Sequence, residues 1–205
     1  MEMADNGYGF FAMLDRMQYI NRWGLMRNNR TENIKEHSFD VAVIAHALAL
    51  IHNNMGGVPK ADPFKVQAYA LYHDCTEIIT GDLPTPIKYR NEEIKKAYKE
   101  VEHEAADRLS SLLPDEMKDE YMELLDPSYE QGGEEGILTG RLVKAADRIA
   151  AYIKCILEES SGNKEFSSAK ETIKETIDKI DLPEVGYFME KFLPSYGITL
   201  DEITR

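Results

Sequence analysis

Residues 36–53, EHSFDVAVIAHALALIHN, carry the pattern that decides the fold of this chain. Most of the residues are apolar, and the segment is long enough for about five helical turns. A helix that is apolar on almost all sides is typical of the centre of a larger protein. We therefore predict a buried central helix here, ended by the breaker sequence GGVP at residues 56–59.

Outside this segment the chain also shows helical periodicity, with apolar residues repeating every three and four positions. The first such helix covers Phe10–Ile20, and Asp62 and Pro63 have the residue types of a helix N-cap and first position. No segment shows the sustained alternation of a strand, so we predict an all-α protein with a single domain over residues 1–205. The other predicted helices lie at about residues 62–75, 92–113, 114–125, 134–159, 164–180 and 183–193.

Two segments between these helices are expected to be irregular loops. Residues 80–89, TGDLPTPIKY, contain a glycine and two prolines, and residues 127–133 begin with proline and end with two glycines. We divide the domain into a metal-binding core at about residues 20–160 and C-terminal helices at residues 164–195 that pack on it.

Composition limits the classes of partner. The chain is 43% hydrophobic and 30% charged, as is usual for a folded globular protein. With 24 basic and 37 acidic residues its formal net charge is −13, so we expect neither a nucleic-acid polymer nor a membrane as partner. There are only two cysteines, and the N-terminus lacks the apolar run of a secretory signal, so we expect a cytoplasmic protein.

Four side chains on three predicted helices have the chemistry of a metal site: those of His37, His73, Asp74 and Asp147. A lone histidine or aspartate is usually structural. However, Asp147 lies in the apolar sequence LVKAADRIAAYI, where a buried carboxylate needs a cationic partner or a metal. Two imidazoles and two carboxylates suit one divalent ion such as Mn, Co, Fe, Zn or Mg. Such a set leaves positions open for water and a substrate oxygen, as metal-assisted hydrolysis requires.

Acidic residues follow the His73–Asp74 pair closely. Glu77 comes four residues after His73, so on a continuous helix the two share a face, and Glu77 could handle the proton of a metal-bound water. Asp82 and Thr85 lie in the proline-rich loop, where they could meet a sugar hydroxyl or a phosphate. The alternative is structural: Asp82 caps the turn and Glu77 pairs with a lysine. We assign Cys75 to the core.

The segment NRWGLMRNNR, residues 21–30, contains three arginines and no acid. Arg22 stands beside Trp23, the only tryptophan, which suggests a guanidinium for phosphate and a flat ring for a base or sugar. The alternative is an ordinary loop in which Trp23 packs on the core and the arginines pair with surplus acids.

The order His37, His73–Asp74, Asp147 resembles the metal-binding pattern of the HD-domain phosphohydrolase superfamily. Within that superfamily the chain is most similar to the YfbR-type 5′-deoxynucleotidases, and the similarity extends from about Phe10 to Ile203. The segments that carry it are INRWGLMRNNRTENIKEHSFDVAVIAHALA, YHDCTEIITGDLPTPIKY, LVKAADRIAAYIKC and YFMEKFLPSYGITLDEI.

This resemblance implies a cytoplasmic, homodimeric helical bundle of the HD type that takes part in nucleotide metabolism. It would remove phosphate from deoxyribonucleoside 5′-monophosphates, as a phosphoric monoester hydrolase. The resemblance assigns one divalent metal to His37, His73, Asp74 and Asp147. It assigns catalysis to Arg22, which would orient the phosphate, and to the acids Glu77 and Asp82. The residues it places at the substrate are Arg22, Trp23, Asp74, Asp82, Leu83, Pro84, Thr85 and Asp147.

Two other functions stay open at this stage. A different HD phosphohydrolase, acting on nucleoside triphosphates or cyclic nucleotides, would share the metal ligands. A non-catalytic helical nucleotide-binding module is the other class, although such a module has no need to bury Asp147 beside two histidines.

Overall fold

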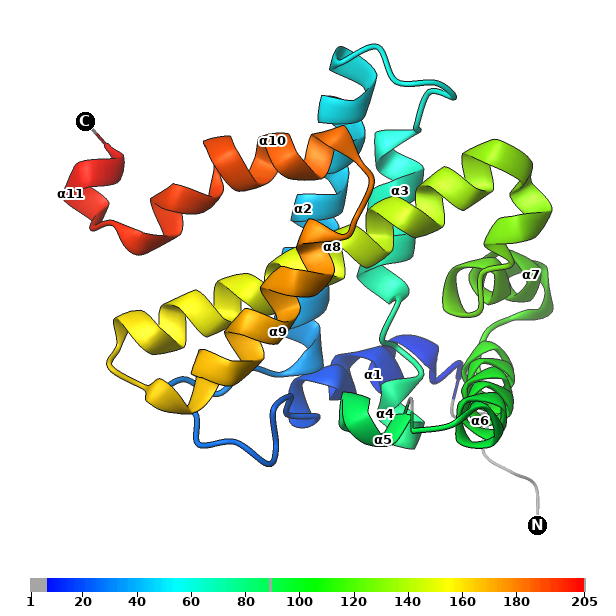
Figure 1. The fold of residues 1–205 in the computed structure, drawn as a ribbon. Helices are drawn as coiled ribbons and strands as arrows, with labels where there is room; N and C mark the ends of the chain where they lie inside the picture. The colour runs from blue at the N-terminus through cyan, green and yellow to red at the C-terminus, as the bar shows by residue number, and fades with distance from the viewer. Residues whose placement is uncertain (1–6, 89, 205) are drawn as a thin grey trace. The chain divides into compact units, whose positions relative to one another are not determined.

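The computed structural model describes residues 7–88 and 90–204, except for the side chains of Thr85 and Pro86. These residues are mainly helical (Figure 1). The one extended pairing among them is a single antiparallel bridge between Asn21 and Asn33. The predicted all-α class is therefore confirmed.

The helical elements follow one another along the chain, with η marking a 3-10 helix. They are α1 (Phe10–Asp15), η1 (Arg16–Tyr19), α2 (Ile34–Asn54), α3 (Pro63–Tyr72), α4 (Glu77–Thr80), α5 (Thr85–Lys88), α6 (Glu92–Ser110), α7 (Asp115–Leu125), η2 (Tyr129–Gly132), α8 (Gly133–Ser160), η3 (Lys164–Phe166), α9 (Ser167–Asp178), α10 (Pro183–Lys191), η4 (Leu193–Gly197) and α11 (Leu200–Ile203). In the described part of the chain no helix combines the length and the apolar character that a membrane span requires.

The described residues pack into two compact units. The first unit contains the chain up to Trp23, residues 32–38 and residues 72–128. The second contains residues 24–31, residues 39–71 and the chain from Tyr129 onward. Helix α2 gives its first residues to the first unit and the remainder to the second.

The core of the first unit is built around Phe10 of α1. Phe10 is fully buried, and its ring meets that of Tyr121 in α7 edge to face, with centroids 4.8 Å apart. Ile34 at the start of α2 and Cys75 in the turn after α3 belong to the same core. Because these two residues are anchored, the candidate ligands next to them in sequence are held in place. The remaining members are Met17, Ala106, Leu109, Leu113 and Leu125.

Helix α2 is buried along only part of its circumference, so the prediction of a buried central helix holds for one side of it only. Val41 and Leu48 are fully buried, whereas Phe39, Val43 and Leu50 are 63%, 49% and 43% exposed. The exposed three are separated by four and seven residues, which places them on one face of the helix. We call these three residues the α2 stripe. Exposed apolar surface of this kind marks interaction sites.

The helix that begins after Asp62 starts as predicted but ends early. The Asp62 carboxylate accepts hydrogen bonds of 2.9 and 3.2 Å from the N–H groups of Phe64 and Lys65, which confirms its capping role. The helix was expected to reach Cys75, yet α3 ends at Tyr72. The next four residues form tight turns before α4 begins.

The segment TGDLPTPIKY is not wholly irregular, because residues Thr85–Lys88 form the short helix α5. The N–H groups of Ile87 and Lys88 both donate to the carbonyl of Pro84, at 2.8 and 3.2 Å. Proline is tolerated in the first turn of a helix, where its missing N–H is not needed. The prolines of this segment, which predicted an irregular loop, therefore lie at the start of a short helix.

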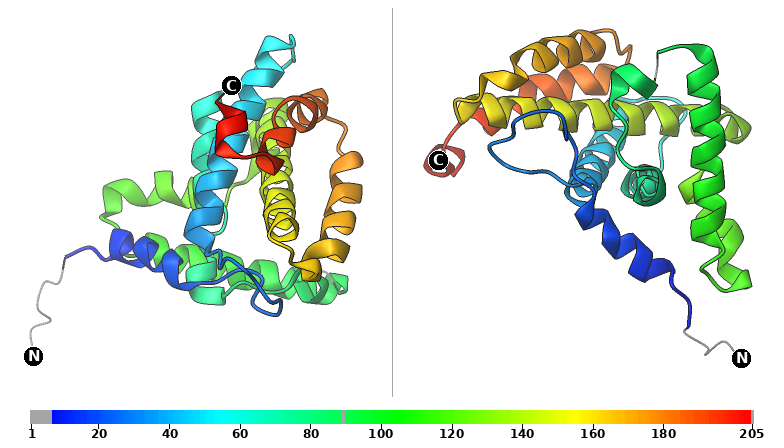
Figure 2. Two further views of the ribbon diagram at one scale, coloured as in Figure 1. Left: turned by 90° about the vertical axis from the view of Figure 1, so that its left-hand side faces the viewer. Right: turned by 90° about the horizontal axis from the view of Figure 1, so that it is seen from below.

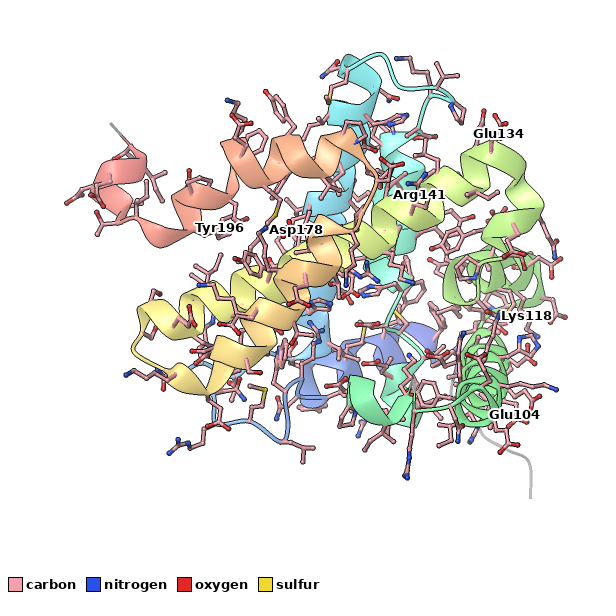
Figure 3. The ribbon with its side chains drawn as sticks, viewed as in Figure 1. Glu104, Lys118, Glu134, Arg141, Asp178 and Tyr196 are labelled. Carbon is pink, nitrogen blue, oxygen red and sulfur yellow. The ribbon has the colours of Figure 1, made fainter. Side chains whose placement is uncertain are left out.

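The second unit contains the long helix α8, with α9 running antiparallel beside it (Figures 1 and 2). The inner face of α8 is buried, and outward side chains such as Arg141 of α8 and Asp178 of α9 are exposed (Figure 3). Helix α11 was not predicted from the sequence. Its signal was a capping box, in which Thr199 and Glu202 bond each other's backbone N–H groups. The buried residues of this inner face include Leu138, Leu142, Ala145, Ile149, Tyr152 and Ile153.

Glu158 of α8 fastens the loop of residues 24–31 within the second unit. Its carboxylate is 2% exposed and accepts hydrogen bonds from the N–H groups of Asn29 and Arg30, at 2.9 and 3.1 Å. It also pairs with the buried Lys154 at 2.5 Å and accepts from Nδ2 of Asn163 at 2.8 Å. Burial alone would raise the pKa of Glu158, but these bonds outweigh burial and lower the pKa to about 2.

Replacing Glu158 by alanine should lower the free energy of unfolding by about 3–5 kcal/mol, because Lys154 is then buried without a counter-charge. The matched control, Glu159→Ala, removes a contact to Lys170 between side chains that are each about 30% exposed, and should cost at most about 1 kcal/mol. Urea denaturation followed by circular dichroism measures both.

The Glu158 contribution also depends on pH. Its folded pKa of about 2 lies below its ordinary value of 4.5, so its stabilisation is present above pH 4.5 and is lost as the pH falls toward 2. The stability gap between the unaltered chain and Glu158→Ala should therefore shrink over that range. An equal gap at neutral pH and near the folded pKa would contradict this assignment.

Candidate functional site

The segment before Arg22 pairs with the segment that leads into α2. The N–H of Arg22 donates to the carbonyl of Glu32 at 2.9 Å, and that of Ile34 donates to the carbonyl of Ile20 at 3.0 Å. This pairing closes a loop and fixes the backbone on both sides of it. His37 follows three residues after Ile34, so the same pairing fixes the start of the helix that carries this candidate ligand.

The side chains of Arg22 and Trp23 both contact Glu32. Its Oε2 atom lies 3.3 Å from Nη1 of Arg22 and accepts a hydrogen bond of 3.1 Å from Nε1 of Trp23. Glu32 is a residue that the sequence prediction missed, because it lies just beyond the arginine-rich segment. Its only signal was its place as the first acid after that segment. The alternative that arginines here pair with acids is confirmed for Arg22, and for Arg27, which lies 3.4 Å from Glu165.

His37, His73 and Asp74 come together in the first unit. One ligand atom from each lies within 4.8 Å of those from the other two. Oδ2 of Asp74 is 3.8 Å from Nε2 of His37 and 3.2 Å from Nε2 of His73, and the two imidazole centroids are 5.5 Å apart. Burial alone would raise the pKa of Asp74. The two imidazoles and the Arg22 guanidinium outweigh it and hold that pKa well below its ordinary value.

This group fits a divalent metal ion. Donor atoms bound at about 2.1 Å to one ion lie roughly 3 to 3.5 Å apart, close to the separations seen around Asp74. Imidazole and carboxylate donors suit the first-row divalent metals. His37 is fully buried, while His73 and Asp74 are 15% and 19% exposed, so the group is partly exposed.

Asp147 lies on α8 in the second unit and is half-buried. Its neighbours Ala146 and Ile149 are fully buried, as the apolar sequence around it predicted. The three clustered residues belong to the first unit. The role of Asp147 as the fourth ligand therefore stays a prediction.

Glu77 does not share a helix with His73, so the prediction that both lie on one helical face is wrong. Glu77 opens α4, after the turn residues 73–76. Its side chain is nevertheless buried close to the ligand group. Burial, together with the neighbouring charges of Asp74 and Asp82, raises its pKa to about 9, while the charges of Lys88 and Arg22 oppose that rise. Among the described residues, Oε2 of Glu77 has no hydrogen-bond partner.

Asp82 connects the loop after α4 to the arginine–tryptophan pair. Its carboxylate accepts a hydrogen bond from the backbone N–H of Trp23 and interacts electrostatically with the guanidinium of Arg22. Burial raises its pKa above the ordinary value, and these two contacts oppose that rise. Leu83 and Pro84 are half-buried beyond it, and the Thr85 side chain lies outside the described residues.

Lys88 is a second residue that the sequence prediction missed. Its ammonium lies 2.6 Å from Glu102 and 4.5 Å from the centroid of the Tyr98 ring, and its charge acts on Glu77. The signal was available, because Lys88 belongs to the distinctive segment TGDLPTPIKY, residues 80–89.

Cys75 is a core residue, as predicted. It is 1% exposed, and its Sγ lies 3.6 Å from Sδ of Met17. Burial raises the pKa of its thiol, which removes it from the candidate chemistry.

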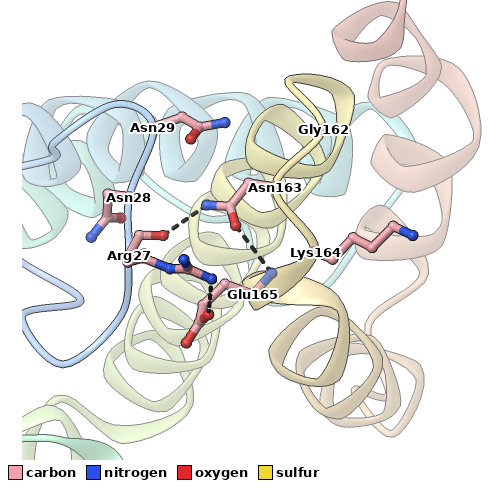
Figure 4. A pocket seen from close by; sticks show the side chains of 7 residues that line it. All are labelled: Arg27, Asn28, Asn29, Gly162, Asn163, Lys164 and Glu165. Atoms are coloured by element: carbon pink, nitrogen blue, oxygen red, sulfur yellow. Dashed lines mark hydrogen bonds and ion pairs between the residues drawn. The ribbon is translucent and has the colours of Figure 1, made fainter.

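A pocket of about 430 Å³ opens in the second unit between residues 27–29 and residues 162–165 (Figure 4). Arg27 and Glu165 pair in its wall, and Asn163 donates to the carbonyl of Arg27 at 2.7 Å. None of the predicted site residues that the structure describes lines this pocket.

Solved structures named HD-domain phosphohydrolases share this fold. One from Listeria innocua aligns with a TM-score of 0.77 and 24% identity over 91% of this chain and 87% of that one. The HD phosphohydrolase of cyanophage S-2L, solved with dA and one catalytic Zn²⁺ ion, aligns with a TM-score of 0.62 and 19% identity over 90% and 96%. The fold is that of the HD-domain phosphohydrolases. Together with the His37–His73–Asp74 group, it supports a divalent metal.

The family follows from sequence. The model of the YfbR-like 5′-deoxynucleotidase family matches residues 9–196. Relatives named 5′-deoxynucleotidase from Erwinia tasmaniensis and Yersinia pestis are 46% and 47% identical, over 96% and 95% of this chain and 96% of each relative. The chain belongs to the YfbR-like 5′-deoxynucleotidase family, and the enzyme class predicted from its sequence is confirmed.

The metal assignment predicts that His73→Ala loses bound metal, because it removes one imidazole from a small donor set. Elemental analysis of the purified protein should give a metal content well below that of the unaltered chain, and Asp147→Ala should behave in the same way. The control is His103→Ala, which removes an exposed histidine paired with Asp126 at 2.6 Å and should keep the metal. Full metal content in the His73 and Asp147 variants would refute the ligand set.

Proposed function

We propose that this chain hydrolyses deoxyribonucleoside 5′-monophosphates to a deoxynucleoside and phosphate, using one divalent metal ion of the Co, Mn, Zn, Fe or Mg type. The observation that carries the proposal is the group of His37, His73 and Asp74, whose ligand atoms lie within 4.8 Å of one another. These residues would hold the ion together with Asp147. When bound, the ion supplies a Lewis acid for the phosphoryl oxygen and lowers the pKa of bound water.

Arg22 is the cation that we assign to the phosphate. Its charge acts on Asp74, Glu77 and Asp82, so it lies in the same electrostatic environment as the ligand group. A guanidinium has five N–H donors in a fixed plane, which suits the oxygens of a phosphate. Arg22 would orient the ester and neutralise charge that develops on the transferring group.

Glu77 is the residue that we assign to proton transfer, with Asp82 as the second acid. Burial keeps the pKa of Glu77 near 9, so its carboxyl carries a proton at neutral pH when only protein charges act on it. A cation beside Asp74 would lower that pKa toward the working pH, where an acid–base group is most effective.

The nucleoside part of the substrate would lie against Trp23 and the loop after α4. Trp23 offers an aromatic face, and Asp82 is tied to its backbone. We propose Leu83, Pro84 and Thr85 as further contacts, since they continue that loop.

The two units would together form one HD domain, with a core at about residues 20–160 and C-terminal helices at residues 164–195. The continuity of α2 from one unit into the other supports this.

We also propose a cytoplasmic homodimer. The α2 stripe supports the homodimer, together with Phe64 and Leu71 of α3, which are 75% and 41% exposed. Symmetric dimers bury self-complementary apolar surface of this kind. Sedimentation of the purified chain and fractionation of cells test the two statements, and a monomer at high concentration would exclude the dimer.

A panel of nucleotides tests the activity. We expect phosphate release from dAMP in the presence of a divalent metal, and none after thorough chelation. Preference for dATP or a cyclic nucleotide would instead indicate another HD phosphohydrolase. Binding without turnover of any nucleotide would indicate the non-catalytic module, and full activity after complete metal removal would refute the mechanism.

Glu77→Gln should slow turnover by about 10²–10⁴-fold, because glutamine keeps the shape of the side chain but cannot transfer the proton. Metal content and dAMP binding should stay near those of the unaltered chain, measured by elemental analysis and calorimetry. The control is Glu104→Gln, at an exposed position on α6 (Figure 3). Loss of metal would identify Glu77 as a ligand. Normal turnover would mean that another acid transfers the proton, and Asp82 would then be assigned that role.

A further inference from the structure

Glu32 contacts two residues that the proposed function assigns to different parts of the substrate. A single carboxylate oxygen, Oε2, lies 3.3 Å from Nη1 of Arg22 and 3.1 Å from Nε1 of Trp23. The guanidinium and the indole are also close to each other, with 5.9 Å between the guanidinium carbon and the ring centroid. The phosphate-orienting cation and the aromatic ring are therefore held through one atom.

The backbone of Glu32 strengthens this link. Its carbonyl accepts the N–H of Arg22 at 2.9 Å, so Glu32 fixes both the main chain and the side chain of that residue. Trp23 has a φ of +59°, a left-handed conformation that is unfavourable for a bulky residue and needs support from its surroundings. The bond from Trp23 Nε1 to Glu32 is one such support.

The charges around Arg22 indicate a second role for Glu32, which is to select one orientation of the guanidinium. Arg22 acts on three other carboxyl groups, those of Asp74, Glu77 and Asp82. An arginine among several acids has competing orientations, and a phosphate ester needs only one of them. The contact to Glu32 is made through Nη1 and joins side chains that are 14% and 13% exposed, where charge-assisted bonds are strong.

We propose that Glu32 is a positioning residue that holds the side chains of Arg22 and Trp23 in fixed orientations relative to each other before the substrate binds. The inference rests on the proposed function, since it takes Arg22 to bind phosphate and Trp23 to contact the nucleoside. Glu32 itself does not touch the substrate. Its effect on the reaction passes through the two side chains that it holds.

The chain offers a matched control for this pair. Arg27 and Glu165 form an arginine–glutamate contact of 3.4 Å, with Arg27 90% exposed. Glu165→Gln removes the carboxylate that contacts Arg27, which lies in the same arginine-rich segment, residues 21–30, but has no assigned part in the reaction. We expect its kinetics to equal those of the unaltered chain.

The first experiment measures dAMP hydrolysis by Glu32→Gln, with metal content and melting temperature as checks on folding. Glutamine can still accept from Trp23 but loses the charge that holds Arg22. We expect kcat/KM to fall about 10- to 100-fold, as for a misplaced positioning group, with metal content unchanged. Inhibition by inorganic phosphate should weaken, while inhibition by deoxyadenosine should change little. In Glu32→Ala both inhibitors should weaken, because Trp23 is released as well.

The second experiment repeats the change in an Arg22→Ala background. If Glu32 acts through Arg22, Glu32→Gln should then have a further effect of less than about 3-fold, since contacting residues are not additive. A full additional loss there, or normal kcat/KM in the single variant, would overturn the proposal. If Glu32→Gln does not fold, Glu32→Asp, which keeps the charge, takes its place and is expected to lose less than Glu32→Ala. An unaltered chain that releases no phosphate from dAMP would instead count against the proposed function.

Discussion

The placement of one carboxylate against two imidazoles is the interaction on which the rest of the first unit depends. Asp74 lies within 3.8 Å of both His37 and His73, although these come from parts of the chain far apart in sequence. This requires α3 to end at Tyr72, so that His73 and Asp74 leave the helix. It also requires α2 to begin just before His37. The core meets both requirements by burying Ile34 beside one ligand and Cys75 beside the others.

A phosphate ester is an unexpected ligand for a chain with a net charge of −13, and the local arrangement resolves this. Burial raises the pKa of Glu77 to about 9, so this acid adds little negative charge at neutral pH. Arg22 contributes a positive charge to the same environment. A cation held by the histidines would add to it. The charge at the site therefore depends on burial as well as on the count of charged residues.

Helices and ligand types were predictable because both depend on local signals. Periodicity marks a helix, and the pairing of histidine with aspartate marks a donor set. The break between α3 and α4 was not predictable, since no proline or glycine interrupts residues 72–77 and tertiary packing decides there. Glu32 was missed because its contacts to Arg22 and Trp23 depend on a backbone pairing across a loop. The exposure of Phe39 was missed because composition does not tell which side of an apolar helix the core covers.

The two cysteines give this chain an internal reporter of its own motions. Cys75 belongs to the first unit and Cys155 to the second, and they are 1% and 0% exposed. Thiol reagents reach a buried sulfur only when the surrounding structure opens. The rates at which the two sulfurs are alkylated would therefore measure opening of each unit separately, without any cysteine being introduced by mutation. Cys75 adjoins Asp74 in sequence, so the same chemistry would report how far an ion at the ligand group restrains the first unit.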